Sequence, residues 1–348
     1  TGTQCKLLAI QSPTVKDNSS FNRALTVYDS NSVISAFNPF QNSVGSVGSK
    51  AIKNISAFEN SLNMNTTTGT YIVDGGGFTL GSTRALTLTN SNIDFNNQNF
   101  SGPTNGITIS TGTNAVKNLN VTTIITHTSG TLNLGTNCAA GNYTFTSGTL
   151  NLAGYTLTIP SFITAIGTKN LTFNGGTLAV TAATTTAFNN AQPANFTTTA
   201  GTGNYGKISM TAATAKTFVG GGSTFNCILS NDGAGALTIT GSNTFIGIAN
   251  GVSPTTFTFT AATTTTLTEW LIFGSSGSLV TIGSATASNH TLSIASGILR
   301  TDYLSISRST ATGGATFYAG ANSTDALNNS GWNFSATKSG SGFLAFAA

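Results

Sequence analysis

Short stretches in which large apolar residues alternate with threonine fill most of this chain. From about residue 66 to residue 335 these stretches are separated by turns rich in glycine, asparagine and serine. Successive side chains on a β-strand point to opposite faces, so the alternation places Leu, Ile and Phe on an inner face and threonine on an outer one. The pattern therefore predicts many short β-strands, among them 71–73, 78–80, 86–88, 107–109, 155–159, 171–173 and 257–259.

One phrase of the sequence occurs twice. Thr128–Leu134 reads TSGTLNL, and the same letters return at Thr146–Leu152. Looser copies follow at 176–180 and 237–241. Self-similarity at such a short period is typical of stacked supersecondary units. We therefore expect an all-β fold, a parallel β-solenoid (β-helix) of roughly 12 rungs.

Two other architectures fit short strands at this spacing. One is a series of tandem β-sandwiches, and the other is an intertwined trimeric β-fibre. The exact return of a phrase after so short an interval favours the solenoid over both.

The first part of the chain has a different texture. Residues 1–48 lack the repeated Thr-Gly pattern, and we interpret them as an attachment segment. Over 49–65 the apolar residues recur every three or four positions after Ser49, which predicts a short helix with Ser49 as its N-cap. Such a helix would cover the open edge of the first rung. Its apolar stripe consists of Ile52, Ile55, Phe58 and Leu62.

The solenoid is expected over 66–301, followed by a terminating module over 302–335. Residues 336–348 then form a Ser/Gly linker and an uncharged apolar tip that contains Phe343, Leu344 and Phe346. This tip fits an arm that docks elsewhere, and it fits equally well a segment that folds back over the last rung.

Composition removes several classes of function. Only 6% of the residues are charged, and the net charge of +4 comes from single basic residues without any basic run, so nucleic acid is not an expected partner. No stretch approaches the ~20 apolar residues of a membrane-spanning helix. The 39% of apolar residues, with 22 Phe among them, is enough for a folded core.

Residues that carry chemistry are sparse. His127 and His290 are the only histidines, and the three cysteines fit no metal-ligand spacing, so we expect no metal site and no catalytic triad. Gly201–Gly206 matches the dinucleotide pattern G-x-G-x-x-G, but a strand-like segment follows it where a helix is required. We therefore expect no cofactor and no enzymatic activity.

One carboxylate pair leaves an enzymatic alternative open. The interval between Asp74 and Asp94 is close to one rung, and stacking would bring the two carboxylates near the ~5 Å separation of a retaining glycosidase. The simpler interpretation is that both are turn residues.

The terminating module carries a resemblance. Gly313-Gly314, then Ala319-Gly320-x-x-Ser323, then Asn329-x-Gly331-Trp332-x-Phe334 resemble the closing module of β-helical structural proteins of tailed, mostly marine, phages and of some bacterial surface proteins. The match covers about a tenth of the chain. Its glycines allow tight turns, and Trp332 with Phe334 can plug the apolar end of a coil. Residues 37–47 are similar to the lead-in to a laminin-G-like lectin domain, but that domain does not follow, which removes the simplest argument for sugar binding.

The resemblance implies a non-enzymatic structural protein at the virion surface, as a tail fibre, a tail spike or a head decoration. Expected partners are other virion proteins, contacted through the N-terminal segment and the C-terminal tip, further copies of the chain in a trimer by analogy, and a host glycan. A bacterial extracellular adhesin or surface filament subunit is the first alternative. A polysaccharide depolymerase spike that uses the Asp74 and Asp94 carboxylates is the second.

Overall fold

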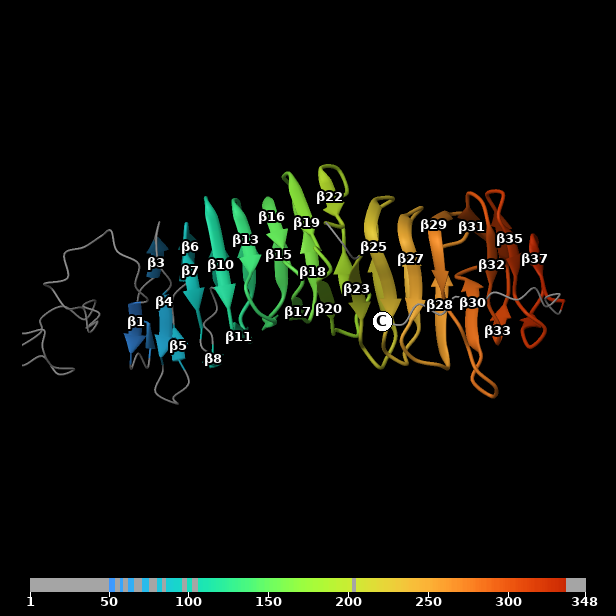
Figure 1. Ribbon diagram of the computed structural model, residues 1–348, viewed down its shortest axis with the longest axis horizontal. Helices are drawn as coiled ribbons and strands as arrows, with labels where there is room; N and C mark the ends of the chain where they lie inside the picture. Colours follow the sequence, from blue (N-terminus) through green and yellow to red (C-terminus); the bar gives the residue numbers. More distant parts are fainter. Residues whose placement is uncertain are drawn as a thin grey trace, which may run out of the picture. The chain divides into compact units, whose positions relative to one another are not determined.

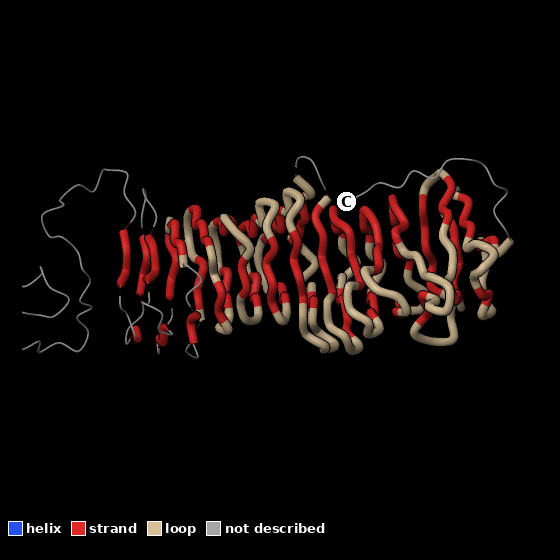
Figure 2. The backbone as a smooth tube through the Cα atoms, turned by 60° about the horizontal axis from the view of Figure 1, so that its bottom comes forward, coloured by secondary structure: helices blue, strands red, loops and turns tan. Residues whose placement is uncertain are grey.

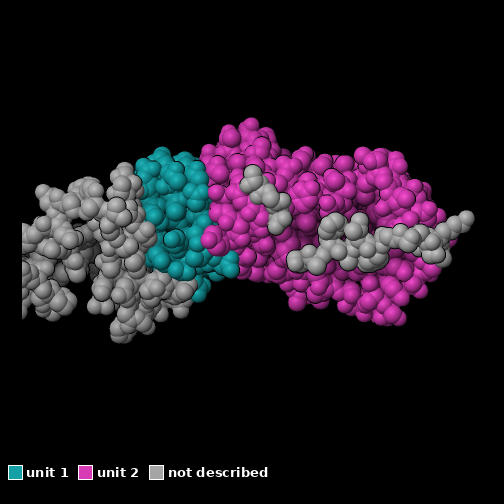
Figure 3. Space-filling view, in the orientation of Figure 1, with its two compact units in different colours: residues 1–141 teal, residues 142–348 magenta. Residues whose placement is uncertain are grey.

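The computed structural model describes residues 50–53, 57–58, 62–65, 71–74, 80–82, 86–95, 99–101, 106–201 and 205–335. The regular secondary structure in these ranges is β-strand throughout, and the ladders between neighbouring strands are parallel. The chain divides into two units, Thr1–Gly141 and Asn142–Ala348, which Figure 3 shows in different colours.

In each unit the chain coils so that a strand pairs with the strand one turn earlier and one turn later (Figure 1). The expected parallel β-solenoid is therefore confirmed, with about 11 turns over both units together. Tandem sandwiches would require antiparallel sheets, and an intertwined fibre would pair strands of different chains. The parallel pairing within one chain excludes both alternatives.

Unit 1 has three strands in each full turn, and the three strands belong to three sheets. Sheet A of unit 1 contains β1 (Lys50–Lys53), β4 (Tyr71–Asp74), β7 (Asn92–Asp94), β10 (Thr113–Lys117) and β13 (Thr131–Leu134); sheet B contains β2 (Ala57–Phe58), β5 (Leu80–Ser82), β8 (Asn99–Ser101), β11 (Asn120–Val121) and β14 (Cys138–Ala139); sheet C contains β3 (Leu62–Asn65), β6 (Leu86–Thr89), β9 (Ile107–Ile109) and β12 (Ile125–His127).

Unit 2 has the same arrangement with more turns and ends with a small additional sheet. Sheet A of unit 2 contains β16 (Gly148–Asn151), β19 (Lys169–Thr172) and β22 (Phe196–Thr199); sheet B contains β17 (Thr156–Ile159), β20 (Thr177–Val180), β23 (Gly206–Met210), β25 (Thr224–Asn231), β27 (Thr244–Asn250), β29 (Thr264–Leu271), β31 (His290–Ile294) and β34 (Ser309–Thr312); sheet C contains β15 (Tyr143–Phe145), β18 (Phe162–Thr164), β21 (Phe188–Asn189), β24 (Lys216–Val219), β26 (Leu237–Thr240), β28 (Thr255–Phe259), β30 (Val280–Ser284), β33 (Leu304–Ile306) and β36 (Thr324–Asp325); sheet D contains β32 (Ile298–Arg300), β35 (Thr316–Tyr318) and β37 (Trp332–Asn333).

The cross-section of unit 2 changes at β22, which is the last strand of its sheet A. In the next turns sheet B has long strands, with 8 residues in β25, 7 in β27 and 8 in β29. The register between β25 and β27 shifts between Phe225 and Ile228, so the long strand bends at this point. A turn here has two strands where earlier turns have three, and the edge of β22 is left without a following strand in its own sheet.

The repeated phrase has a structural explanation at its glycine. In unit 1, Thr113 of β10 pairs with Thr131 of β13, so the step from one turn to the next equals the interval at which the phrase returns. Gly130, just before β13, has φ +72°, and a Cβ atom there would lie 2.4 Å from the carbonyl oxygen of Ser110. Only glycine fits such a close approach between neighbouring turns. Figure 2 shows the short loops that connect the strands at these corners.

The inner face of unit 2 holds a stack of aromatic rings. The register pairs Tyr143 with Phe162, Phe162 with Phe188 and Phe188 with Phe218. These rings stack with centroid distances of 5.6, 5.2 and 4.3 Å and are fully buried. Parallel in-register pairing places the same position of each turn over its predecessor, so like residues form a column.

The prediction of a capping helix over 49–65 is wrong, because the described residues of this range form strands. Ile52 lies in β1, Phe58 in β2, and Leu62 begins β3, while Ile55 is outside the described residues. Strands of two to four residues joined by short connections repeat apolar residues at intervals close to those of a helix turn. The spacing therefore could not separate a short helix from a small three-sided coil.

The C-terminal module is continuous with the coil. Within 302–335, β33, β34 and β36 extend sheets C and B of unit 2, and β35 and β37 complete sheet D. The attachment segment at 1–48 and the linker and tip at 336–348, with Phe343, Leu344 and Phe346, lie outside the described residues.

We expect the aromatic stack to dominate the stability of unit 2. Replacing Phe188 by alanine removes a fully buried ring that stacks on both sides, which should lower the free energy of unfolding by about 3–5 kcal/mol. Urea denaturation followed by circular dichroism measures this loss. The matched control is Ile166→Ala, because this side chain is 79% exposed and its loss should stay within about 0.5 kcal/mol. Equal effects of the two substitutions would contradict the stack.

Candidate functional site

Two polar arrangements of unit 2 lie at the two ends of β25. The side chains of Lys207 and Ser209 lie on one face of β23, opposite the buried Ile208. The register pairs Ser209 with Ser230 of β25, and Asp232 follows directly after β25. A groove lies at the other end of β25, beside β22.

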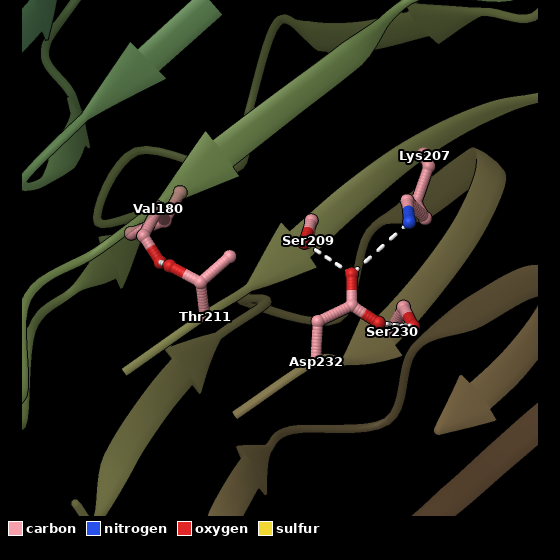
Figure 4. A network of polar contacts seen from close by, with 6 residues as sticks. All are labelled: Val180, Lys207, Ser209, Thr211, Ser230 and Asp232. Atoms are coloured by element: carbon pink, nitrogen blue, oxygen red, sulfur yellow. Dashed lines mark hydrogen bonds and ion pairs between the residues drawn. The ribbon is translucent and has the colours of Figure 1, made fainter. Parts of the chain in front are cut away.

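Asp232 gathers three donors around its carboxylate (Figure 4). Its Oδ2 accepts hydrogen bonds from Ser209 Oγ and from Lys207 Nζ, the latter at 3.0 Å, and its Oδ1 accepts one from Ser230 Oγ at 2.5 Å. We call these four residues the Asp232 cluster. Beside it, Thr211 Oγ1 donates to the carbonyl oxygen of Val180 at 3.2 Å.

The cluster holds the Asp232 carboxylate in its ionised form. Burial alone raises the pKa of Asp232, but the hydrogen bonds from Ser209, Ser230 and Lys207 and the charge of Lys207 outweigh burial and bring the pKa below its usual value. A carboxylate with a lowered pKa and three donors is a weak base, so it does not activate either serine as a nucleophile. The cluster therefore has a structural role: its hydrogen bonds connect β23 to the turn after β25.

The groove beside β22 has a volume of about 530 Å³. Phe196, which is 6% exposed, and Pro193 supply apolar lining, and the hydroxyls of Thr197, Ser223 and Thr224 supply polar lining. The groove lies where the turns change from three strands to two, because β22 is the last strand of sheet A among the described residues.

Hydrogen bonds fix the walls of this groove. Asn226 joins β25 to β22: its backbone N–H donates to Thr198 Oγ1 at 2.7 Å, and its Nδ2 donates to the Thr198 carbonyl oxygen at 2.6 Å. Thr198 Oγ1 in turn donates to the carbonyl oxygen of Thr224 at 3.3 Å. On the next corner, Nδ2 of the buried Asn190 donates to Gly220 O and Ser223 Oγ at 3.1 and 2.9 Å. The groove is thus preformed.

Two buried lysines in unit 2 serve the backbone of neighbouring turns. Lys216 Nζ donates to the carbonyl oxygens of Ala212, Gly235 and Gly233 at 2.7, 2.9 and 3.3 Å. Burial lowers the pKa of Lys216 to about 8, against the opposing effect of the Asp232 charge. Lys169 donates to the carbonyls of Ala165 and Gly167, and burial lowers its pKa too. Both ammonium groups satisfy corner carbonyls that would otherwise be buried without donors.

The two histidines are buried in separate units. His127 Nε2 donates to the carbonyl oxygen of Gly130 at 3.2 Å, while His290 stacks on Phe259 with a centroid distance of 4.6 Å. Neither ring nitrogen of His290 has a hydrogen-bond partner among the described residues. Burial lowers the pKa of each histidine to about 4.

The register does not stack the two aspartates of the glycosidase hypothesis. Asp94 pairs with Ile72, whereas Asp74 pairs with Lys53 of the preceding turn. Because Asp74 lies two positions beyond Ile72 on β4, the two residues are offset by two positions along the paired strands. Asp94 Oδ1 accepts a hydrogen bond from Asn118 Nδ2 at 2.8 Å.

The two residues predicted to plug the coil lie at the end of unit 2. Trp332 is half-buried, packs edge-on against Trp270 and Phe317 with centroid distances of 5.8 and 5.2 Å, and donates from Nε1 to Ser309 Oγ at 3.0 Å. Phe334 is half-buried as well. The capping residues Ile52, Phe58 and Leu62 lie in strands whose side chains are not described.

Sequence reasoning missed the Asp232 cluster, the groove and the lysine contacts. Each joins residues that are far apart in sequence, on turns whose lengths differ. The one available signal was the Asp232-Gly233 pair after a strand, which predicts a turn but no partners.

Among the described residues, no three His, Cys, Asp or Glu side chains lie together as metal ligands. The same residues contain no helix with the length and apolar character needed to span a membrane. Cys138 and Cys227 are buried free thiols, and burial raises the pKa of both.

We expect Asp232→Asn to destabilise unit 2 at neutral pH by roughly 1–3 kcal/mol, because charge-assisted hydrogen bonds are lost. The folded-state pKa of Asp232 is lowered, so its contribution is present above the unfolded pKa and is lost as pH falls through the folded pKa. Urea unfolding of the wild type and the variant at neutral pH and in acid should show a difference that shrinks in acid. A difference of the same size under both conditions would refute the charged role.

His290→Phe should make unit 2 less sensitive to acid. With a folded pKa of about 4 and an ordinary value of 6.5, the unfolded chain binds a proton that the folded chain does not, so stability falls as pH drops from 6.5 to 4. The full effect is about 3 kcal/mol. Phenylalanine keeps the stacking on Phe259 and has no proton to bind. Thermal unfolding at neutral pH and just above the folded pKa tests this, with the exposed Ile298→Ala as the control that should keep the wild-type slope.

Comparisons with protein-family models, with curated proteins and with solved structures found no match to this chain.

Proposed function

We propose that this chain is a non-enzymatic structural protein of a phage particle, located at the virion surface as a tail fibre, a tail spike or a head decoration. In this proposal the coil is a scaffold, and the segments at 1–48 and 336–348 contact other virion proteins.

The supporting observation is the form that the C-terminal module takes. Its residues resemble the closing module of phage β-helical structural proteins, and they form the last strands β34, β36 and β37 of their sheets among the described residues. Trp332 packs over Trp270 and Phe317 at this end. An architectural motif that ends a coil suits a protein whose role is its shape.

The distribution of polar contacts also supports a scaffold role. The carboxylate of Asp232 and the ammonium groups of Lys169 and Lys216 all bind groups of the coil itself. The offset between Asp74 and Asp94 argues against the retaining pair of the depolymerase alternative, since such a pair needs two facing carboxylates.

Immunogold electron microscopy of purified particles from the source culture tests the proposal. Antibodies against the purified chain should label particle surfaces, and peptide mass spectrometry of the same particles should recover the chain. Preimmune serum is the control. Label on the bacterial envelope with none on particles would support the adhesin instead, and a chain found only in the cytosol would reject both.

A further inference from the structure

We propose that the groove beside β22 is a binding site for a neutral glycan. This inference rests on the proposed surface location and identifies what that surface would recognise. The lining of the groove has an apolar part with Phe196 and Pro193 and a hydroxyl part with Thr197, Ser223 and Thr224. A sugar ring has the same two kinds of surface, a face of C–H groups and a rim of hydroxyls, so it can use both parts of the lining at once.

The charge around the groove selects a neutral ligand. None of the residues that line the groove is charged. The nearby cations are already engaged, since Lys207 donates to Asp232 and Lys169 donates to two backbone carbonyls. An acidic polysaccharide or a phosphate would lose water in the groove without gaining a cation, which costs free energy.

An exposed aromatic ring lies next to the groove along the register. Gly206 of β23 pairs with Cys227 of β25, so Tyr205 and Asn226 occupy the preceding position on the two strands. Neighbouring strands are about 4.8 Å apart, and Asn226 lines the groove. Tyr205 is 49% exposed, whereas most large apolar and aromatic side chains of unit 2 are buried. An exposed flat ring on the strand beside the groove-lining Asn226 is a platform on which the apolar face of a sugar can stack.

The alternative occupant, a peptide that adds a strand to the edge of β22, is blocked by the groove's own hydrogen bonds. The Thr198 carbonyl oxygen, which faces away from β19, already accepts from Asn226 Nδ2. The Thr198 side chain also bridges to the backbone of Asn226 and Thr224. An incoming strand would find this part of the edge already capped, whereas a glycan needs only the side-chain hydroxyls and the apolar lining.

The site is rigid before any ligand arrives. The Gly220–Ser223 corner is held by Asn190 from one side, and Asn243 Oδ1 accepts from the Gly222 N–H at 3.1 Å. A preformed groove avoids the entropy cost of ordering loops on binding, which matters for sugars because each contact is weak.

The test is binding of the purified full chain to an immobilised array of neutral and acidic bacterial glycans, followed by calorimetry with the neutral oligosaccharide that gives the strongest signal. We expect neutral glycans to bind. Tyr205→Ala should weaken binding about tenfold because the platform is lost. Thr224→Trp should abolish binding, because the exposed Thr224 lines the groove and a larger side chain fills it.

Tyr155→Ala is the matched control. Tyr155 is also an exposed tyrosine directly before a strand of sheet B, 38% exposed, but its strand β17 is two strands away from β23 and is not the neighbour of β25, so its loss should leave binding unchanged. Thermal unfolding of all three variants verifies that each is folded. The proposal is overturned if no neutral glycan binds, if only acidic glycans bind, or if a folded Thr224→Trp variant binds as the wild type does. Immunogold labelling is independent of this result, so failure of the glycan site and failure of the virion location remain distinguishable.

Discussion

Parallel, in-register pairing between successive turns is the constraint on which the rest of the structure depends. Because each strand lies directly beside the strand of the next turn, corresponding residues of successive turns stack on one another and have similar surroundings. This is why Tyr143, Phe162, Phe188 and Phe218 form one stack, and why threonine is acceptable at outward positions. A core of this kind is a column, and each turn is stabilised only by its neighbours.

The same constraint creates a polar problem at the corners. Where the chain leaves one sheet and enters the next, backbone carbonyls come inside the coil without ladder partners. Buried side chains with several donors solve this problem: Lys216 serves three carbonyls, and Asn243 serves those of Thr240 and Gly241. Lys169 and Lys216 are thus used inside the fold, whereas hydroxyls and an amide line the groove on the outside.

The groove arises where the regular pattern changes. As long as every turn has three strands, each strand edge is covered by the following turn. Sheet A of unit 2 stops at β22, and the long strand β25, which bends and lies against β22, forms no backbone ladder with it. Asn226 and Thr198 satisfy that edge with side-chain hydrogen bonds, and the space that remains is the groove. A recognition site can therefore appear on a repetitive scaffold without any catalytic motif.

The sequence by itself determined the strands, the solenoid and the inward column, because the alternation of apolar residues with threonine and the returning TSGTLNL phrase report local backbone geometry directly. It did not decide the first turns, where Ile52, Phe58 and Leu62 recur at intervals that suit a helix as well as three short strands. It also left the partners of Asp232 and the separation of Asp74 from Asp94 open. Turn lengths vary along the chain, so only the tertiary structure sets which residue of one turn lies beside which residue of the next, and every polar site here depends on that register.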